Sequence, residues 1–301
     1  MSAAVRYRIR HATTYKYGGN VVHSRQLLHL TPRSAPWQTC LAHGIDLDPM
    51  PVSRRDEQDV FGNTVTRLEF DRPHDRLEVV ASMEVEVRPR PAPDAECTES
   101  WERVRDDLVY TSRPLAPRKL DAVCYRMQSP YVRVKHVFER YAHECFPAGR
   151  PILAGAEALM SKLHADFTYA PGETTIATPL MRVFETRRGV CQDYAHLMIA
   201  CLRSLGLAAR YVSGYLRTLA AAGEASLVGA DASHAWLAVY CPPLGWVELD
   251  PTNGIRAGID HVAVAWGRDF GDVSPLRGVI IGGGVHQPSV SVTVAPIAAA
   301  S

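Results

Sequence analysis

A cysteine, a histidine and an aspartate, far apart in the chain, are the residue types that a nucleophilic site requires. Cys191 opens the segment CQDYAHLMIACLRSLG, in which apolar residues recur at steps of three and four. This spacing predicts a helix that begins at the cysteine, and the unpaired N–H groups of a helix N-terminus favour a thiolate. Cys191 is therefore a candidate nucleophile, although an isolated cysteine on such an apolar stripe is more often a buried structural residue.

The predicted helix offers no partner for this thiol. A cysteine nucleophile needs a base within hydrogen-bond reach, and the base needs a third group that holds its orientation. His196 lies about 140° round the helix from the cysteine and Asp193 about 200° round it, at about 100° per residue. Neither side chain can easily face the thiol, so the base must come from another part of the chain.

A predicted β-hairpin brings a histidine and an aspartate together. Residues 234–240 and 246–250 read as strands joined by a five-residue connection. If the two residues that flank this connection face each other, His234 and Asp250 are diagonal neighbours on one sheet face, about 7–8 Å apart. A slip of one residue would put them on opposite faces, so this register is a specific prediction. Taken singly, His234 is also explained as a locally satisfied strand-end residue, and Asp250 as a turn former.

The elements that precede this site differ in character from those that carry it. The first 90 residues show β-branched enrichment and stretches of alternation, and turn signals stand at 18–20, 48–49 and 62–63. They predict a small antiparallel β domain over residues 1–90. The proline-rich stretch RPRPAP follows and reads as a linker.

Helical patterns dominate the middle of the chain. Residues 91–150 are predicted to form the linker and a helical segment, with one helix over 130–145. The core is predicted over 151–270 and starts with a helix over 152–166, because a proline stands at the first turn. Residues 271–301 are predicted to form a C-terminal β tail. The expected fold class is therefore α+β.

Composition excludes several classes of protein. The chain has 301 residues, 47% of them hydrophobic, and 33 basic residues against 32 acidic ones, so no nucleic-acid partner is expected. No apolar run approaches the roughly 18 residues of a membrane span, and no secretory signal is visible. We therefore expect a cytoplasmic protein with no membrane partner. Seven cysteines without a CxxC pair predict neither a zinc site nor a disulfide framework, and we expect no cofactor.

Four motifs occur in order along the core and carry a resemblance to a known family. They are GVCQDYAH at 189–196, ARYVSGY at 209–215, SHAW at 233–236 and WVELDPTN at 246–253, and the segments DFTYAPG at 166–172 and DVSPLRGVIIGGG at 272–284 also fit. The chain resembles the bacterial transglutaminase-like family over most of its length. The resemblance implies an N-terminal β domain followed by a papain-like core, in which a helix carrying the cysteine packs on an antiparallel sheet.

The same resemblance implies a role for each candidate residue. Cys191 matches the nucleophile, His234 the general base and acid, and Asp250 the residue that orients the histidine. The implied reaction is acyl transfer from a peptide or protein amide through a thioester. The backbone N–H of Cys191 and the Tyr169 hydroxyl are expected to bind the oxyanion, and Trp236 to cover the thiol.

Three functions remain open on the sequence. Hydrolysis by a peptidase or amidase ranks slightly above transfer to an amine, because water needs no dedicated acceptor site. A non-catalytic binding module is a third alternative, but it predicts the loss of a triad member and all three are present. The EF-hand spacing DxDxDG is absent, which disfavours a calcium-activated crosslinking enzyme. The substrate and the oligomeric state are not indicated.

Overall fold

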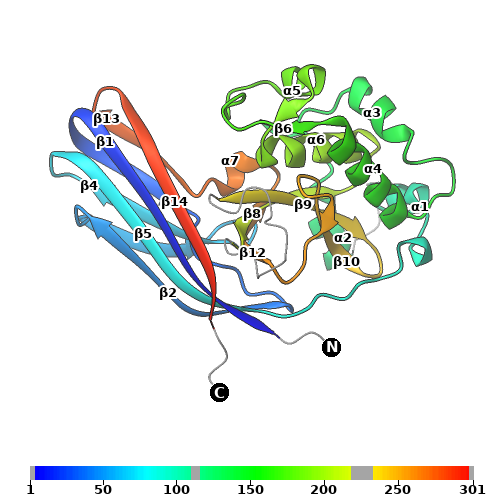
Figure 1. The fold of residues 1–301 in the computed structure, drawn as a ribbon, viewed down its shortest axis with the longest axis horizontal. Helices are drawn as coiled ribbons and strands as arrows, with labels where there is room; N and C mark the ends of the chain where they lie inside the picture. The colour runs from blue at the N-terminus through cyan, green and yellow to red at the C-terminus, as the bar shows by residue number, and fades with distance from the viewer. Residues whose placement is uncertain (1–3, 110–115, 218–232, 298–301) are drawn as a thin grey trace.

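The computed structural model describes residues 4–109, 116–217 and 233–297. Figure 1 shows long antiparallel strands in one part of the molecule, and a second part in which helices cover a shorter sheet. This arrangement confirms the predicted α+β fold, with an N-terminal β domain followed by a mixed core. In the described part of the chain, no helix has the length and apolar composition needed to cross a membrane.

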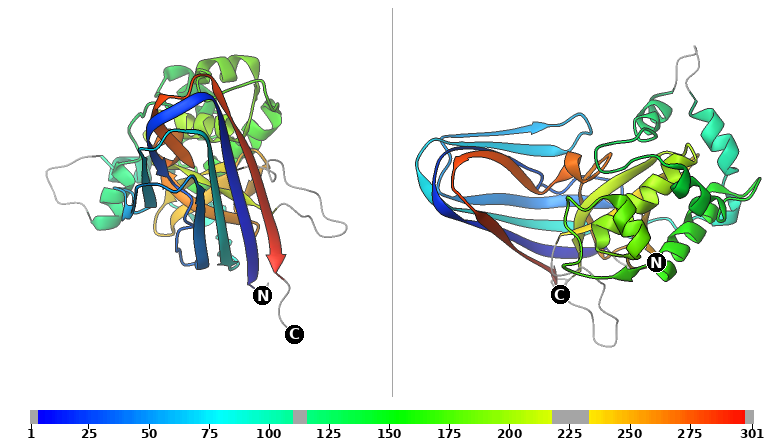
Figure 2. Two further views of the ribbon diagram at one scale, coloured as in Figure 1. Left: turned by 90° about the vertical axis from the view of Figure 1, so that its left-hand side faces the viewer. Right: turned by 90° about the horizontal axis from the view of Figure 1, so that it is seen from above.

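The β domain is a seven-stranded antiparallel sheet built from both ends of the chain. Its strand order is β2-β5-β1-β4-β3, and β13 and β14 also pair with β1. The strands are β1 (Val5–Leu28), β2 (Gln38–Asp48), β3 (Ser53–Gln58), β4 (Thr64–Phe70), β5 (His74–Val87), β13 (Leu276–Gly282) and β14 (His286–Ile297). The segment predicted as a C-terminal β tail therefore adds two strands to the N-terminal sheet, and Figure 2 shows β14 alongside β1.

The turn predicted at residues 18–20 lies within β1, at the point where the chain bends back: the residues before it pair with β14 and those after it pair with β13 (Figure 2). β1 runs through this point as one strand of 24 residues, and its pairing with β5 shifts in register between Lys16 and Val21. A Cβ at Gly18 would lie 3.2 Å from the carbonyl oxygen of Val285. The N–H groups of Gly18 and Gly19 donate to carbonyls in the turn between β13 and β14. These glycines allow the bend of β1 and the turn between β13 and β14 to approach each other closely.

The core contains a five-stranded antiparallel sheet and seven α-helices among the described residues. The sheet order is β11-β10-β9-β8-β12, from β8 (Ala209–Leu216), β9 (His234–Cys241), β10 (Gly245–Asp250), β11 (Ile255–Arg256) and β12 (His261–Gly267). Two short parallel strands, β6 (Thr168–Tyr169) and β7 (Arg188–Gly189), form a separate pair. The helices are α1 (Trp101–Asp107), α2 (Pro117–Val123), α3 (His136–His143), α4 (Ile152–Asp166), α5 (Leu180–Thr186), α6 (Cys191–Ser204) and α7 (Phe270–Val273).

The helix predicted over 130–145 begins six residues late, at His136. Ser129 and Val132 exchange backbone hydrogen bonds in a turn, and the N–H of Tyr131 donates to the carboxylate of Asp269 at 2.9 Å. The helix therefore begins after this turn, and a distant carboxylate satisfies the N–H of Tyr131. By contrast, the helix predicted over 152–166 matches α4 at both ends.

Helix α6 begins at Cys191, as predicted, but it is buried on nearly all sides. It packs on β8 and β9 and is covered by α3, α4 and α5. Polar residues of α6 are buried with the apolar ones, and the guanidinium of Arg203 donates to the carbonyls of Tyr125, Ala209 and Arg268. The apolar stripe predicted from the sequence therefore accounts for only part of the surface that α6 buries.

Candidate active site

Cys191 is the first residue of α6, and Asp193 caps the helix beneath it. The carboxylate of Asp193 accepts the N–H of Val190 at 2.8 Å and the hydroxyl of Thr174 at 2.6 Å. A Cβ at Gly189 would lie 2.7 Å from this carboxylate, so the position requires glycine. Burial raises the pKa of Asp193, although both hydrogen bonds lower it. Asp193 satisfies the helix N-terminus and, as predicted, is not the partner of the thiol.

His196 is held by contacts that leave it no part in the chemistry. Its Nε2 accepts the backbone N–H of Phe270 at 3.1 Å. The ring stacks on Tyr131, with centroids 5.8 Å apart, and it contacts Tyr211 at 4.9 Å. Burial lowers the pKa of His196 to about 3, so the imidazole is neutral. The geometry therefore agrees with the prediction that His196 is not the base.

Replacing His196 with glutamine should leave the reactivity of Cys191 unchanged, to within about threefold, because glutamine retains an acceptor for the Phe270 N–H. Stability should fall by about 1 kcal/mol through loss of ring stacking. The rate of iodoacetamide alkylation on the Cys191 peptide, followed by mass spectrometry, measures the first effect, and thermal denaturation measures the second. A hundredfold slower reaction in a folded variant would show that His196 takes part in the chemistry.

His234 and Asp250 lie next to each other, in the predicted register. Tyr240 faces Trp246 across the hairpin, which confirms the pairing, although the two strands extend so far that the connection has three residues instead of five. Nε2 of His234 lies 2.9 Å from Oδ2 of Asp250, and both side chains are fully buried. The expected diagonal neighbours thus form a direct hydrogen bond.

The carboxylate of Asp250 accepts five hydrogen bonds. Oδ2 accepts from Nε2 of His234 at 2.9 Å, Nε2 of His261 at 3.2 Å and Nδ2 of Asn253 at 2.7 Å. Oδ1 accepts the backbone N–H groups of Thr252 at 3.0 Å and Asn253 at 3.3 Å. Burial alone would raise the pKa of Asp250, but the charge of His234 and the hydrogen bonds from His234 and His261 hold it well below its usual range. Asp250 is therefore an ionised, fixed carboxylate.

The imidazole of His234 lies between this carboxylate and the thiol of Cys191. Burial would lower the pKa of His234, but the charges of Asp250 and Cys191 and hydrogen bonding to both raise it well above that of a free imidazole. Its other nitrogen, Nδ1, is buried and has no nitrogen or oxygen partner within the described residues. Cys191 itself is 8% exposed. One buried imidazole is therefore in contact with both a carboxylate and a thiol.

Tyr169 lies beside the first turn of α6. In the pair formed by β6 and β7, Tyr169 stands opposite Gly189, two residues before Cys191. Burial raises the pKa of Tyr194, and Tyr169 acts in the same sense. The structure thus brings Tyr169 near the N-terminus of α6.

Trp236 contacts the imidazole and belongs to a different side of the sheet from α6. Its ring stacks on His234, with centroids 5.9 Å apart and an interplanar angle of 28°. It packs with Val212 and Ala238 in a small cluster, whereas the alternate residues of β9 pack with α6. The indole N–H donates to Glu248 at 2.7 Å. Trp236 therefore contacts the imidazole of His234 and the carboxylate of Glu248.

Sequence reasoning missed two donors to Asp250. Asn253 lies in the motif WVELDPTN, where an Asp followed three residues later by Asn in a turn is a local signal that could have been used. His261 is eleven residues beyond Asp250 on another strand, and no spacing rule points to it. In the described ranges, no group of three or more His, Cys, Asp or Glu residues could hold a metal ion.

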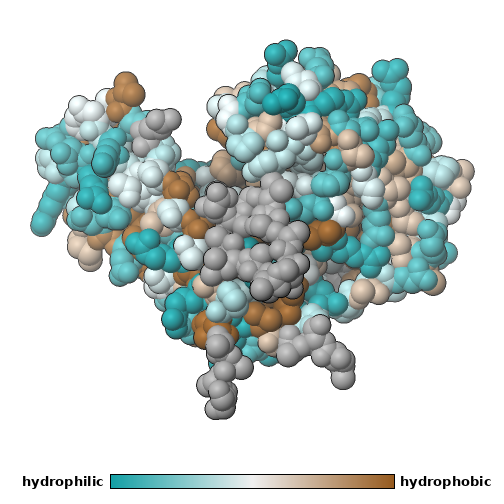
Figure 3. Space-filling model, in the orientation of Figure 1, coloured by the Kyte–Doolittle hydropathy of each residue, from teal (hydrophilic) through white to brown (hydrophobic). Residues whose placement is uncertain are grey.

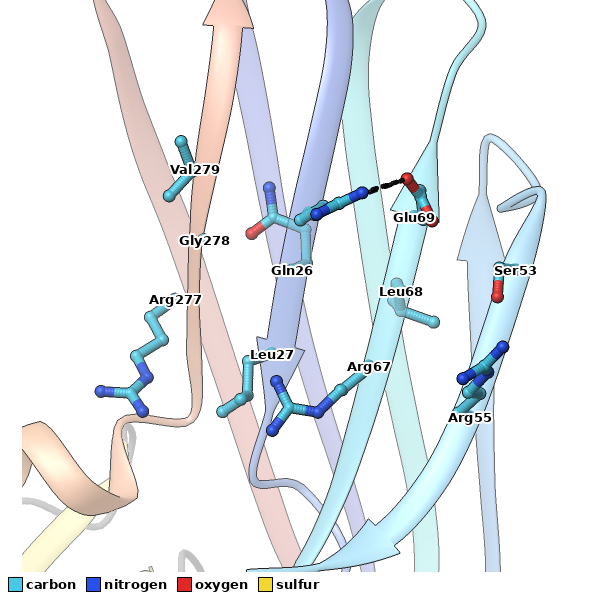
Figure 4. A pocket seen from close by; sticks show the side chains of 11 residues that line it. Gln26, Leu27, Ser53, Arg55, Arg67, Leu68, Glu69, Arg277, Gly278 and Val279 are labelled. Atoms are coloured by element: carbon cyan, nitrogen blue, oxygen red, sulfur yellow. Dashed lines mark hydrogen bonds and ion pairs between the residues drawn. The ribbon is translucent and has the colours of Figure 1, made fainter.

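A pocket of about 580 Å³ lies elsewhere, on the β domain (Figure 4). Four arginines line it with other side chains of β1, β3, β4 and β13: Arg25, Arg55, Arg67 and Arg277. Arg25 is paired with Glu69 at 3.0 Å, and Arg67 with Glu57. Figure 3 shows that the surfaces of the β domain and of the helical part are mostly hydrophilic. This pocket shares no residue with the site around Cys191.

Comparison with known proteins gives two family matches that follow each other along the chain. Residues 7–86 match the bacterial transglutaminase-like N-terminal region, and residues 139–251 match the transglutaminase-like superfamily. The first match covers the β domain, and the second covers α6 and the hairpin that carries His234 and Asp250.

Individual relatives agree with these matches. An uncharacterised protein of Mycobacterium bovis is 36% identical over 98% of this chain and 94% of its own length. A solved structure from Cytophaga hutchinsonii, described as a candidate cysteine protease, superposes with a TM-score of 0.79 over 100% of this chain and 93% of its own, at 20% identity. A protein-glutamine γ-glutamyltransferase of Pseudomonas aeruginosa is 32% identical over 41% of this chain and 21% of its own length. The chain therefore belongs to the bacterial transglutaminase-like family, with its N-terminal region and its transglutaminase-like core.

Proposed function

We propose that this protein is a cysteine-dependent enzyme that cleaves an amide bond of a peptide or protein through a thioester intermediate. The observation that supports it best is the fully buried imidazole of His234, placed between Cys191 and an ionised Asp250 that accepts five hydrogen bonds. A histidine with a purely structural role would not require an ionised carboxylate beside it, and a cysteine with a purely structural role would not require an imidazole beside its thiol. Together these groups form a nucleophile, a base and an orienting anion.

In the first half of the reaction, Nδ1 of His234 takes the thiol proton, and the Cys191 sulfur forms a bond to the carbonyl carbon of the substrate. The carbonyl oxygen becomes an oxyanion that the backbone N–H of Cys191 and the hydroxyl of Tyr169 stabilise. The C–N bond then breaks, and Nδ1 returns the proton to the departing nitrogen. An amine or ammonia leaves, and the acyl group remains on the sulfur as a thioester.

In the second half, water gives a proton to Nδ1 of His234 and attacks the thioester carbon. The C–S bond breaks, the sulfur recovers the proton, and a carboxylic acid is released. Asp250 takes no proton at any stage, because His234 and His261 hold its pKa well below its usual range. Trp236 supports the imidazole by stacking on its ring, and Glu248 fixes the indole in turn.

Transfer of the acyl group to an amine is the second candidate function. It uses the same three residues, with an amine replacing water in the second half. The partial match to the protein-glutamine γ-glutamyltransferase of P. aeruginosa favours it. We rank hydrolysis first because water needs no acceptor site. The cytoplasm remains the predicted compartment.

A thioester on Cys191 is the intermediate that tests both candidates. The full-length protein is incubated with a tryptic digest of bacterial proteins, quenched in acid and digested, and the Cys191 peptide is searched for added acyl mass. We expect an adduct that decays in water, and whose acyl group appears on a dansyl-labelled alkylamine if transfer is the reaction. If the adduct decays and no acyl group appears on the labelled amine, the result supports hydrolysis.

Alkylation gives a control that needs no substrate. Cys97 and Cys124 are exposed thiols of the same chain, whereas Cys191 is buried. An activated Cys191 should react with iodoacetamide faster than either of them at pH 7, despite its burial. A Cys191 that reacts more slowly than both exposed thiols and never carries an acyl group would end the proposal.

A further inference from the structure

Strand β12 lies at the edge of the core sheet, and side chains of the β domain cover its free edge. The amide of Gln38 donates to the carbonyl of Ala263 at 2.7 Å and accepts the N–H of Ala263 at 2.8 Å. The amide of Asn63 does the same with Trp266, at 2.9 and 3.0 Å. Two carboxamides thus replace the peptide groups of a neighbouring strand and pair an otherwise open edge.

The strand held in this way begins with His261, one of the donors to Asp250. The backbone N–H of Gly258 donates to Nδ1 of His261 at 3.2 Å, so Nδ1 carries no proton. Nε2 must therefore carry the proton that it donates to Oδ2 of Asp250 at 3.2 Å. Burial lowers the pKa of His261, which keeps the ring neutral, although Asp250 acts in the opposite sense. Its tautomer and its direction are both fixed.

Arg90, in the linker that leaves the β domain, reaches the same region. Its guanidinium donates to Glu248 at 2.7 Å and to the carbonyl of His261 at 3.4 Å, and only 11% of the side chain is exposed. Glu248 also accepts the indole N–H of Trp236, on which the imidazole of His234 stacks. Arg90 of the linker therefore contacts β12 at His261, and it also contacts Glu248, which holds the indole that stacks on His234.

We propose that His261 is a positioning residue for Asp250, and that the β domain sets its place through the covered edge of β12 and through Arg90. The inference rests on the proposed function, because Asp250 matters only if it orients His234. It gives the N-terminal domain a role in the site: the domain completes the sheet on which the orienting carboxylate is held.

Replacing His261 with leucine tests this role, because leucine removes the donor and fills the space. Without it, Asp250 is less firmly aimed at His234, the thiolate–imidazolium pair weakens, and alkylation of Cys191 at pH 7 should slow about tenfold. His261→Gln restores both a donor for Asp250 and an acceptor for Gly258, so it should recover most of the rate. Gln38→Met, which removes the amide pairing on β12, should slow alkylation in the same sense by about threefold.

The matched control is His11→Gln. His11 is a buried histidine at the same domain interface, bonded to Tyr215 at 2.9 Å and Thr13 at 3.0 Å, with no contact to Asp250. It should lower stability and leave the Cys191 rate unchanged. A folded His261→Leu protein with the wild-type rate would overturn the inference, and so would equal slowing by His11→Gln.

Two further readouts keep the test decisive. If His261→Leu does not fold, Gln38→Met carries the comparison, and a wild-type alkylation rate in Gln38→Met overturns the inference. The downfield proton resonance of the hydrogen bond between His234 and Asp250 should broaden in Gln38→Met and stay sharp in His11→Gln. Failure of the proposed function looks different: the wild-type Cys191 would then react no faster than Cys97 and Cys124.

Discussion

Replacing Cys191 with alanine is expected to reduce amide cleavage by at least about 10⁴-fold, because every step of the proposed reaction passes through a bond to its sulfur. The variant should fold normally, since the side chain is small and no hydrogen bond of the helix terminus depends on it. Intact-mass and peptide mass spectrometry should find neither an acyl adduct nor iodoacetamide on this peptide, while Cys97 and Cys124 remain labelled.

Cys201 provides the matched control for this substitution. It lies on the same helix and is fully buried, and burial holds the pKa of its thiol well above the usual range. Cys201→Ala should therefore lose about 1 kcal/mol of stability and no activity. Amide cleavage that survived in Cys191→Ala, with purified protein and no contaminating protease, would remove Cys191 from the mechanism.

Replacing Asp250 with asparagine is expected to lower turnover by about 10²- to 10⁴-fold while the fold is kept. An asparagine carries no charge and offers N–H groups where His234 now donates. The imidazole would turn its lone pair towards the amide and keep its proton on Nδ1, the nitrogen that must accept the thiol proton. Steady-state kinetics should show the loss in kcat, with the KM for the same substrate little changed.

The pH dependence of the same variant separates orientation from simple instability. Asp250 raises the pKa of His234, so removing its charge lowers that pKa. The alkaline limb of the bell-shaped rate profile, where the imidazolium loses its proton, should therefore move to lower pH. Asp269→Asn is the control, because Asp269 is a buried carboxylate that accepts the N–H groups of Tyr131 and Gly271. Loss of stability with an unmoved alkaline limb in Asp250→Asn would assign Asp250 a structural role only.

The start of α6 and the hairpin of the site were predictable because both depend on short stretches of sequence. A 3.6-residue period identifies a helix whatever lies around it, and a glycine before Cys191 marks its beginning. A tight connection leaves few registers, and apolar burial on one sheet face selects among them. The prediction that placed His234 beside Asp250 therefore used only residues 234–250.

The places where local signals were incomplete involve contacts with distant residues. Gly18 and Gly19 mark a bend, but β1 continues through it, beside the turn between β13 and β14. Pro130 is a good helix start, but Ser129 and Val132 form a turn, and the helix begins only at His136. Neither the neighbouring turn at β13 and β14 nor Asp269, which accepts the N–H of Tyr131, is visible within a window of twenty residues.

The sequence by itself predicted that a helix begins at Cys191 and that the hairpin register sets His234 beside Asp250, because periodicity and turn length act locally. Only the tertiary structure decided that His261 also holds Asp250, and that Gln38, Asn63 and Arg90 hold its strand. Those contacts join residues up to 225 positions apart. They depend on how two domains pack, and no local spacing encodes that packing.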